Sequence, residues 1–243
     1  MRLLQLNAWA LRLGSQVEEM IKQESPDVAL LQEILQSDKS LGFLPTLNQF
    51  QSVVRFHHHF YSPVYGFKWM ESEAEFGNAI ISNLEFHDSQ TVFTHAEYTK
   101  DFSYDTSDYN ARNFQHVVVA DQNNTKFHLI NHHGYHVPAH KKGNDFTLKA
   151  CQQIADYAAR LEGPIIITGD FNLEPHSESI EVLNKMFRNL SIEYHLKTTR
   201  NQFTSKVEVC DYIFVNDHVQ VKDFYVSEII ASDHQGLVLD FEV

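Results

Sequence analysis

The chain has 243 residues, of which 43% are hydrophobic and 12% aromatic, enough to bury one sizeable core. The formal net charge of −13 argues against a long electrostatic track for nucleic acid, although a bound cation and a few basic residues still allow contact with one phosphate. No stretch approaches the roughly 18 apolar residues of a membrane span, and two cysteines are too few for a disulfide framework, so we predict a cytoplasmic protein with no membrane span.

The first elements are a strand, a helix and a second strand. Residues 2–6 alternate like a strand that ends at Asn7, and this segment lacks the cleavage site of a signal peptide. The segment 15–24 has the apolar spacing of a helix. The apolar run 27–32 then predicts a buried strand that ends at Glu33.

The second half of the chain repeats this outline. The pattern predicts a strand over 126–131 that ends near His132 and His133, followed by a long helix over 145–161. The run 165–168 is again a buried strand, ending at Asp170. Two strand–helix–strand units, each delivering polar residues at strand ends, suggest two related halves packed together.

The remaining segments favour strands over helices. Strand-like patterns occupy 51–56, 64–70, 77–82, 90–94 and 114–120, a Tyr- and Asp-rich loop lies over 97–112, and three further strands lie over 210–215, 220–226 and 236–243. With no linker or low-complexity tract, we predict a single α/β domain over 1–243. Two packed sheets with helices outside would bury these runs.

Polar residues stand where buried strands begin or end. Asn7, Glu33 and Asp170 follow apolar runs, and Asp211 opens another. A carboxylate at such a position is poor core material, because burying it unpaired costs several kcal/mol. Each one alone is also what an exposed loop residue or a helix N-cap looks like.

The string GDFN adds information through its spacing. In an extended chain Asp170 and Asn172 point to one side, while Phe171 points into the core. Gly169 removes a side chain where a ligand would approach. A carboxylate and an amide would thus face the same space.

Two histidine motifs are candidates for acid–base chemistry. Asp233-His234 precedes the last strand, where it is equally typical of a turn. In the other motif Asn131 and His133 share one strand face and His132 points away. We therefore favour His133 as the functional histidine, with His132 left as the alternative.

In chain order the motifs LNAW, LLQE, GNAI, NHHG, GDFN, CDYIF and SDH resemble the endonuclease/exonuclease/phosphatase superfamily. The resemblance runs from Asn7 to His234 and implies a DNase I-like fold, a four-layer α-β-β-α sandwich of two mixed sheets. It also implies roles for matching residues. The metal-site residues would be Asn7, Glu33 and Asp233, with Glu33 the direct ligand, and the catalytic residues would be His133, Asp170, Asn172, Asp211 and His234.

Charge supports a metal at this site. Two of these carboxylates about 4 Å apart would repel by about 4 kcal/mol at an effective dielectric near 20. A hard divalent cation relieves that repulsion, and oxygen ligands without thiolate favour Mg²⁺, or Mn²⁺, over zinc.

The predicted function is hydrolysis of a phosphate ester by an activated water, in a phosphodiesterase or nuclease. The alternatives are a non-catalytic binding module on the same fold and a phosphomonoesterase acting on a lipid or sugar phosphate. The substrate would be a nucleic acid, a phospholipid or a small phosphodiester, and the acidic balance favours a small phosphodiester or an unspecific nuclease. We expect a monomer.

Substrate contacts are less sharply defined, because the basic residues are scattered. Arg112, Asn131 and the pair Lys141-Lys142 are our candidates for contacts with the substrate. Tyrosines of the loop 97–112 are candidates for lining the pocket, namely Tyr98, Tyr104 and Tyr109.

Overall fold

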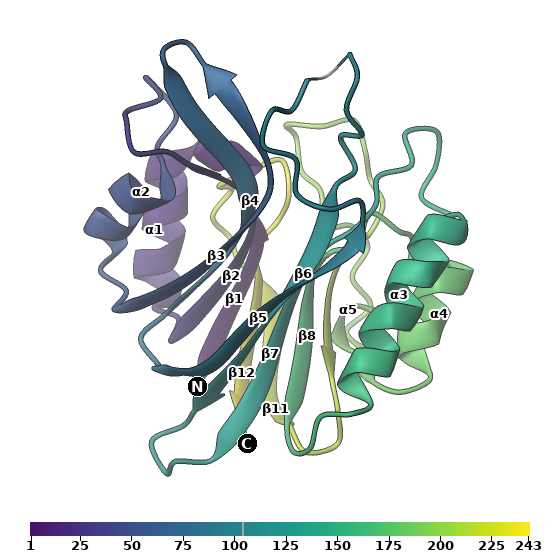
Figure 1. Ribbon diagram of the computed structural model, residues 1–243. Helices are drawn as coiled ribbons and strands as arrows, with labels where there is room; N and C mark the ends of the chain where they lie inside the picture. The colour runs from purple at the N-terminus through teal and green to yellow at the C-terminus, as the bar shows by residue number, and fades with distance from the viewer. Residues whose placement is uncertain (104) are drawn as a thin grey trace.

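The computed structural model describes residues 1–103 and 105–243 and contains two six-stranded sheets packed face to face. Helices α1 (Gly14–Glu24) and α2 (Leu47–Val54) cover the outer face of one sheet, and α3 (Asp145–Ala158) and α4 (Glu178–Asn184) cover that of the other (Figure 1). This arrangement confirms the predicted four-layer α-β-β-α sandwich.

The first sheet joins the N-terminal strands to the C-terminal ones. Its strands, in spatial order, are β11 (Gln220–Val226), β12 (Leu237–Glu242), β1 (Arg2–Asn7), β2 (Val28–Gln36), β4 (Ser72–Ser82) and β3 (His58–Trp69). The pair β1–β2 is parallel, with α1 as the crossover. Because β12 pairs with β1, residues from both ends of the chain meet in this sheet.

The second sheet is built around an equivalent parallel pair. Its strands, in spatial order, are β5 (Phe86–His95), β6 (Arg112–Ala120), β7 (Lys126–His133), β8 (Ile165–Asp170), β10 (Asp211–Val215) and β9 (Arg188–Asn189). The pair β7–β8 is parallel, with α3 as the crossover. Each sheet therefore holds one predicted strand–helix–strand unit at its centre.

The inward faces of the two sheets change from apolar to polar along the strands. Leu3, Leu129 and Ile166 belong to the apolar core between the sheets, and all are fully buried. One step further along β1 and β7 lie Gln5 and Asn131, which are also fully buried. Because side chains alternate along a strand, the next inward residues are those at the strand ends.

Buried amides join the sheets in this middle layer. Gln5 Nε2 donates to Gln32 Oε1 over 2.9 Å, and Gln32 Nε2 donates to Asn131 Oδ1 over 2.6 Å. Asn131 Nδ2 in turn donates to Gln115 Oε1 and to the backbone carbonyl of Leu31. These bonds satisfy polar groups that would each cost free energy if buried unpaired.

Most predicted elements are present, but the strand predicted over 51–56 is wrong. That region lies at the end of helix α2, which Thr46 begins with a capping box closed by Gln49. The paired β-branched residues Val53 and Val54 suggest a strand, whereas the cap and the apolar spacing of Leu47 and Phe50 favour a helix. Here the start signal outweighs the local propensity.

Gly169 is needed for backbone packing. Its φ is +146°, and a Cβ atom there would lie 1.8 Å from the carbonyl oxygen of His132 on the neighbouring strand. The prediction that Gly169 leaves room for a ligand is therefore corrected, because the space goes to strand β7.

Among the described residues, Cys151 and Cys210 are both buried and unpaired. In residues 1–103 and 105–243 no helix combines the length and the apolar character needed to cross a membrane.

Candidate active site

One pocket of about 290 Å³ collects most of the predicted site residues. The predicted residues that line it are Glu33, Arg112, His133, Asp170, Asn172, Asp233 and His234. They share the pocket wall with further aromatic and basic side chains, namely Trp9, Tyr65, Phe76, Tyr109, His136, Arg200 and Lys206. Strand ends far apart in the sequence thus converge on one cavity.

Asp170, the last residue of β8, lies at the centre of the site. Its Oδ1 accepts a hydrogen bond from the backbone N–H of Asn172, 2.9 Å away. Its Oδ2 accepts one from Asn7 Nδ2, 3.0 Å away on the facing sheet. The carboxylate is buried and held from both sides, so its orientation is fixed.

Glu33 reaches the pocket through a β-bulge, although β2 was predicted to end at this residue. Pairing of β2 with β4 shifts register between Leu31 and Ile34, and Glu33 has a φ of +58°. Gln32 already faces the other sheet, so regular alternation would turn Glu33 toward the helices. The bulge instead points its carboxylate inward, where Asn7 Nδ2 donates to Oε1 over 3.1 Å.

His133 and His132 lie on opposite faces of β7. His133 Nε2 lies 3.8 Å from Glu33 Oε1 and 3.9 Å from Asp170 Oδ2. His132 packs its ring edge-on against Phe171, and its Nδ1 lies 3.2 Å from the backbone carbonyl of Asn113. The structure therefore places His133 at the pocket and His132 in the outer core.

His234 is oriented from behind by Asp211. Its Nδ1 lies 2.9 Å from Asp211 Oδ2 and its Nε2 lies 3.5 Å from Asp170 Oδ2. Asp211 also accepts hydrogen bonds from Thr199 Oγ1 over 2.6 Å and from Gln5 Nε2 over 3.3 Å. Thr199 was not among the predicted residues, because it lies in a loop whose sequence carries no pattern.

Arg200 is a second pocket residue that was not predicted, because nothing in the sequence distinguishes it from the other scattered basic residues. Its side chain is only 3% exposed, and its guanidinium contacts His234 Nε2 and lies 3.5 Å from Asp233 Oδ2. Its Nε is buried without a hydrogen-bond partner among the described residues. The guanidinium places a positive charge at the pocket wall, and this charge is suited to attract an anion.

Arg112 and Lys141 differ in their access to the pocket. Arg112 lines it, although its guanidinium is held by the backbone carbonyls of Tyr109, Ala111 and Gly134. Lys141 is buried and does not line the pocket, and its Nζ donates to Asn172 Oδ1 over 2.6 Å. Its contact is with a site residue, while the neighbouring Lys142 is exposed.

Asn131 does not reach the pocket, so its assignment as a substrate contact is corrected. It shares the inward face of β7 with His133 but lies two residues earlier, between the sheets, in the amide layer.

Of the loop tyrosines, Tyr109 lines the pocket, and Tyr98 lines a different pocket near Glu75. Tyr104 lies outside the described residues.

The charges of the site favour an ionised Asp170 beside a protonated His234. Burial alone would raise the pKa of Asp170, but the positive charges of His234 and Arg200 outweigh it and lower that pKa. Burial alone would lower the pKa of His234, but Asp211 and Asp170 raise it. Burial and the charge of Arg112 lower the pKa of His133, which is therefore neutral.

Glu33 is the carboxylate with the greatest need for a cation. Burial raises its pKa, and the hydrogen bond from Asn7 only partly opposes this. Its side chain remains 27% exposed to the pocket, so an ion can reach it. Carboxylate oxygen is the ligand chemistry of a hard divalent cation. Asn7 orients this carboxylate through its Nδ2, while its Oδ1 accepts from the backbone N–H of Trp9.

A second group of atoms is also close enough to share an ion. Atoms of Asp170, Asp211 and His234 lie within 4.8 Å of one another. In this group, however, Nδ1 of His234 is already hydrogen-bonded to the carboxylate of Asp211, so these atoms are not free to hold an ion. Glu33, whose side chain is 27% exposed at the pocket wall, is the more accessible carboxylate.

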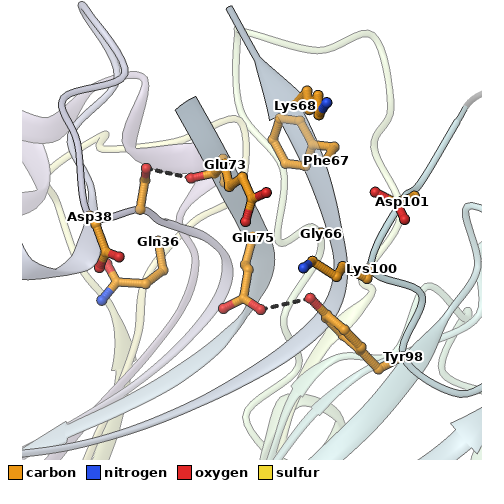
Figure 2. A pocket seen from close by; sticks show the side chains of 12 residues that line it. Gln36, Asp38, Gly66, Phe67, Lys68, Glu73, Glu75, Tyr98, Lys100 and Asp101 are labelled. Atoms are coloured by element: carbon orange, nitrogen blue, oxygen red, sulfur yellow. Dashed lines mark hydrogen bonds between the residues drawn. The ribbon is translucent and has the colours of Figure 1, made fainter. Parts of the chain in front are cut away.

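A different pocket, formed by the β3–β4 hairpin and the loop near Tyr98, carries none of the predicted catalytic residues (Figure 2). Acidic side chains dominate its wall, and Tyr98 Oη donates to Glu75 Oε1 over 2.8 Å. Its position and chemistry set it apart from the cavity around Asp170.

The two-sheet sandwich, with carboxylates, amides and histidines gathered at its strand ends, has the architecture that the sequence resemblance predicts. The model of the endonuclease/exonuclease/phosphatase family matches residues 4–234, and the chain belongs to this family. A comparison with curated proteins gave no match.

Solved structures agree with this assignment at the level of the fold. An endonuclease/exonuclease/phosphatase from Bacteroides vulgatus is 19% identical with a TM-score of 0.76, over 100% of this chain and 98% of that one. A mannosyl-6-phosphatase from Bacteroides thetaiotaomicron is 15% identical with a TM-score of 0.71, over 100% of both chains. The catalytic domain of human Nocturnin, with bound sulfate, is 17% identical with a TM-score of 0.69, over 100% of this chain and 93% of that one.

Proposed function

We propose that this protein is a Mg²⁺- or Mn²⁺-dependent phosphodiesterase that attacks phosphorus with a water molecule. The observation that carries the proposal is the convergence of Glu33, Asp170, Asp233 and His234 on one pocket. Their side chains come from three separate segments of the chain and lie beside the buried Arg200. Such a mixture of anions and cations is suited to a phosphate whose charge changes during reaction.

A divalent cation bound by Glu33, with Asn7 beside it, would supply positive charge to a non-bridging oxygen of the phosphate. Asp170, ionised and aligned by Asn7 and Asn172, accepts a hydrogen bond from the attacking water and takes its proton as the new phosphorus–oxygen bond forms. The ester phosphorus–oxygen bond opposite the water breaks in the same step, and the alcohol group leaves with the bonding electron pair as an alkoxide that takes a proton from solvent.

The histidines and Arg200 would stabilise the phosphoryl oxygens. His234 is fixed through Nδ1 by Asp211, which turns the other edge of its imidazole toward the pocket. Arg200 adds a buried guanidinium on the same side, where it contacts Nε2 of His234. His133 approaches from β7 and supplies a second imidazole donor. Lys141 holds the amide of Asn172 in place.

A small diester fits this pocket better than a long polymer does. The net charge of −13 provides no extended basic face, and the buried cations Arg112 and Arg200 lie at the pocket itself. Electrostatic attraction would therefore act on one phosphate rather than along a nucleic-acid backbone.

The test is hydrolysis of bis-p-nitrophenyl phosphate with Mg²⁺, with Mn²⁺ and with EDTA. Asp170→Asn and His234→Ala should each lower kcat by about 10²- to 10⁴-fold with the thermal midpoint and circular dichroism preserved. The matched controls are the exposed residues Asp217 and His218, changed to Asn and Ala, which should leave kcat unchanged.

Three outcomes would contradict the proposal or one of its parts. Full activity in either site variant would refute its assigned role. No turnover of any phosphate ester with either metal would favour a binding module, and hydrolysis limited to sugar phosphate monoesters would favour a phosphomonoesterase.

A further inference from the structure

A second cavity of about 680 Å³ adjoins the pocket around Asp170. The two share the side chains of Trp9, Glu33, Tyr65 and Phe76, so they lie next to each other. We call the second cavity the aromatic groove. A group attached to a phosphate in the first pocket would have the groove as its neighbour.

The groove is lined mainly by apolar side chains, although the charged residues Arg12, Lys68 and Asp105 also contribute to its wall. Leu41 and Leu44 are buried on one side, and Phe67 and Trp69 from the end of β3 are half-buried on another. Trp9 lies at the junction with the pocket. Both tryptophans of the chain therefore line this cavity.

The aromatic rings of the shared wall are held in a fixed stack. Tyr65 stacks on Phe102 with ring centroids 4.0 Å apart and on Phe76 with centroids 5.2 Å apart. Tyr65 and Phe102 are buried, whereas Phe76 remains half-buried. A preformed wall loses little side-chain entropy when a ligand packs against it.

Trp9 is tied to the phosphate site through its backbone. Trp9, Ala10 and Leu11 have φ values of 49°, 54° and 52°, a left-handed turn that is costly for residues other than glycine. The backbone N–H of Trp9 donates to Asn7 Oδ1 over 3.1 Å, and Arg12 stacks on its indole at 4.8 Å. This turn keeps the indole where pocket and groove meet, and strained backbone of this kind clusters at ligand sites.

We propose that the aromatic groove binds the organic group of the phosphate ester, and that this group carries a flat aromatic ring. The inference rests on the function proposed above. A ring packs on the exposed edges and faces of Trp9, Phe67 and Trp69 in the offset or edge-on geometry that aromatic pairs prefer. The substrate class is therefore an aryl- or nucleobase-bearing phosphodiester.

The test compares phosphonates that carry one organic group each and cannot be hydrolysed. Phenyl-, hexyl- and methylphosphonate are measured as competitive inhibitors of bis-p-nitrophenyl phosphate hydrolysis. Phenylphosphonate should have an inhibition constant roughly tenfold lower than methylphosphonate, a difference of about 1.4 kcal/mol. Hexylphosphonate should lie between them.

Intrinsic fluorescence gives a readout that does not depend on turnover. Because both tryptophans line the groove, phenylphosphonate should change the emission with the same affinity that inhibition gives, and methylphosphonate should change it little. Trp69→Phe keeps the apolar wall and isolates Trp9 as the single fluorophore.

The variants Trp69→Ala and Phe67→Ala should each reduce the phenyl-to-methyl affinity ratio by roughly threefold or more, through lost ring contact. Met70→Ala is the matched control, because Met70 is 88% exposed at the hairpin tip and does not line the groove. Thermal midpoints establish that each variant is folded.

The failures are distinguishable. Equal inhibition by methyl- and phenylphosphonate in an active enzyme would contradict the proposal that the groove binds the organic group, and would leave the proposed phosphodiesterase activity unaffected. If hexylphosphonate binds more tightly than phenylphosphonate, the groove binds an alkyl chain and the proposal of an aromatic ring is wrong. Absence of turnover overturns the proposed function, and the fluorescence titration then still decides whether the groove binds a ring.

Discussion

Thr199 shows how the site depends on a residue that no motif contains. Its hydroxyl donates to Asp211 Oδ2 over 2.6 Å and accepts from the backbone N–H groups of Cys210 and Asp211. Asp211 in turn holds Nδ1 of His234. A loop hydroxyl thereby fixes the position of an imidazole that faces the pocket.

We predict that Thr199→Val lowers kcat about tenfold with little change in KM, because a loose Asp211 misaligns His234 only where charge develops. Thr199→Ser should restore most of the rate, since it keeps the hydroxyl. Steady-state kinetics over a range of pH measures both. Equal defects in the Val and Ser variants would show that the methyl group matters and the hydrogen bond does not.

Glu33 illustrates what can and cannot be predicted at the residue scale. The motif LLQE marks it as a metal-site residue through the resemblance, but regular strand alternation would turn it away from the site. The bulge that reverses its direction is formed without glycine, at a φ of +58°, so the sequence has no local sign of it. Arg200 is similar, because its burial depends on loop packing.

At the scale of elements, apolar periodicity predicted the central strands well. The runs that became β1, β2, β7 and β8 are continuous or alternating and end at polar residues, as buried strands do. Helix α2 was missed because the window 51–56 begins after its capping box and contains two adjacent valines. Short α4 and α5 (Leu190–Glu193) give too few turns for a clear period.

A histidine pair ties the second sheet to helix α3, outside the active site. His116 Nε2 lies 2.9 Å from His128 Nδ1, and His116 Nδ1 lies 2.8 Å from the hydroxyl of Tyr157. Burial and the neighbouring His128 lower the pKa of His116 to about 4, and burial also lowers the pKa of His128. Both rings are therefore neutral in the folded protein near neutral pH.

We predict that this pair makes the protein less stable in mild acid. As pH falls from 6.5 toward 4, these histidines take up protons in the unfolded chain but stay neutral in the folded protein. The free energy of unfolding therefore decreases. At about 1.4 kcal/mol per pKa unit, His116 contributes at most about 3 kcal/mol of this loss. Urea unfolding at pH 7 and pH 4.5 should show a smaller loss for His116→Gln than for the wild type. His57→Gln, at an exposed position, is the control, and identical losses in all three proteins would contradict the prediction.

At the scale of the whole molecule, the inward faces form three successive layers. Apolar residues such as Leu3 and Ile166 give way to amides such as Gln5 and Asn131, and these give way to Asn7, Glu33 and Asp170. Strand parity made the first layer predictable, and the last layer as well except for Glu33, which a bulge turns inward. The middle layer was not, because a buried amide and a ligand-binding amide look alike until the facing sheet is in place.

A substitution of Asn131 can distinguish a structural amide from one that binds a ligand. We predict that Asn131→Leu lowers the free energy of unfolding by about 2–4 kcal/mol, because Gln32 and Gln115 each lose a buried partner. Activity per folded molecule should change less than threefold. Urea unfolding and kcat measured well below the thermal midpoint test both statements. A large loss of kcat with unchanged stability would return Asn131 to the substrate site.

The position of β12 between β11 and β1 has a consequence for biosynthesis. The ribosome makes β1 early, but β1 gains its partner β12 only after more than two hundred further residues have been made. His234, three residues before β12, is delivered at the same late stage. The proposed catalytic site therefore cannot be complete until this late stage of translation.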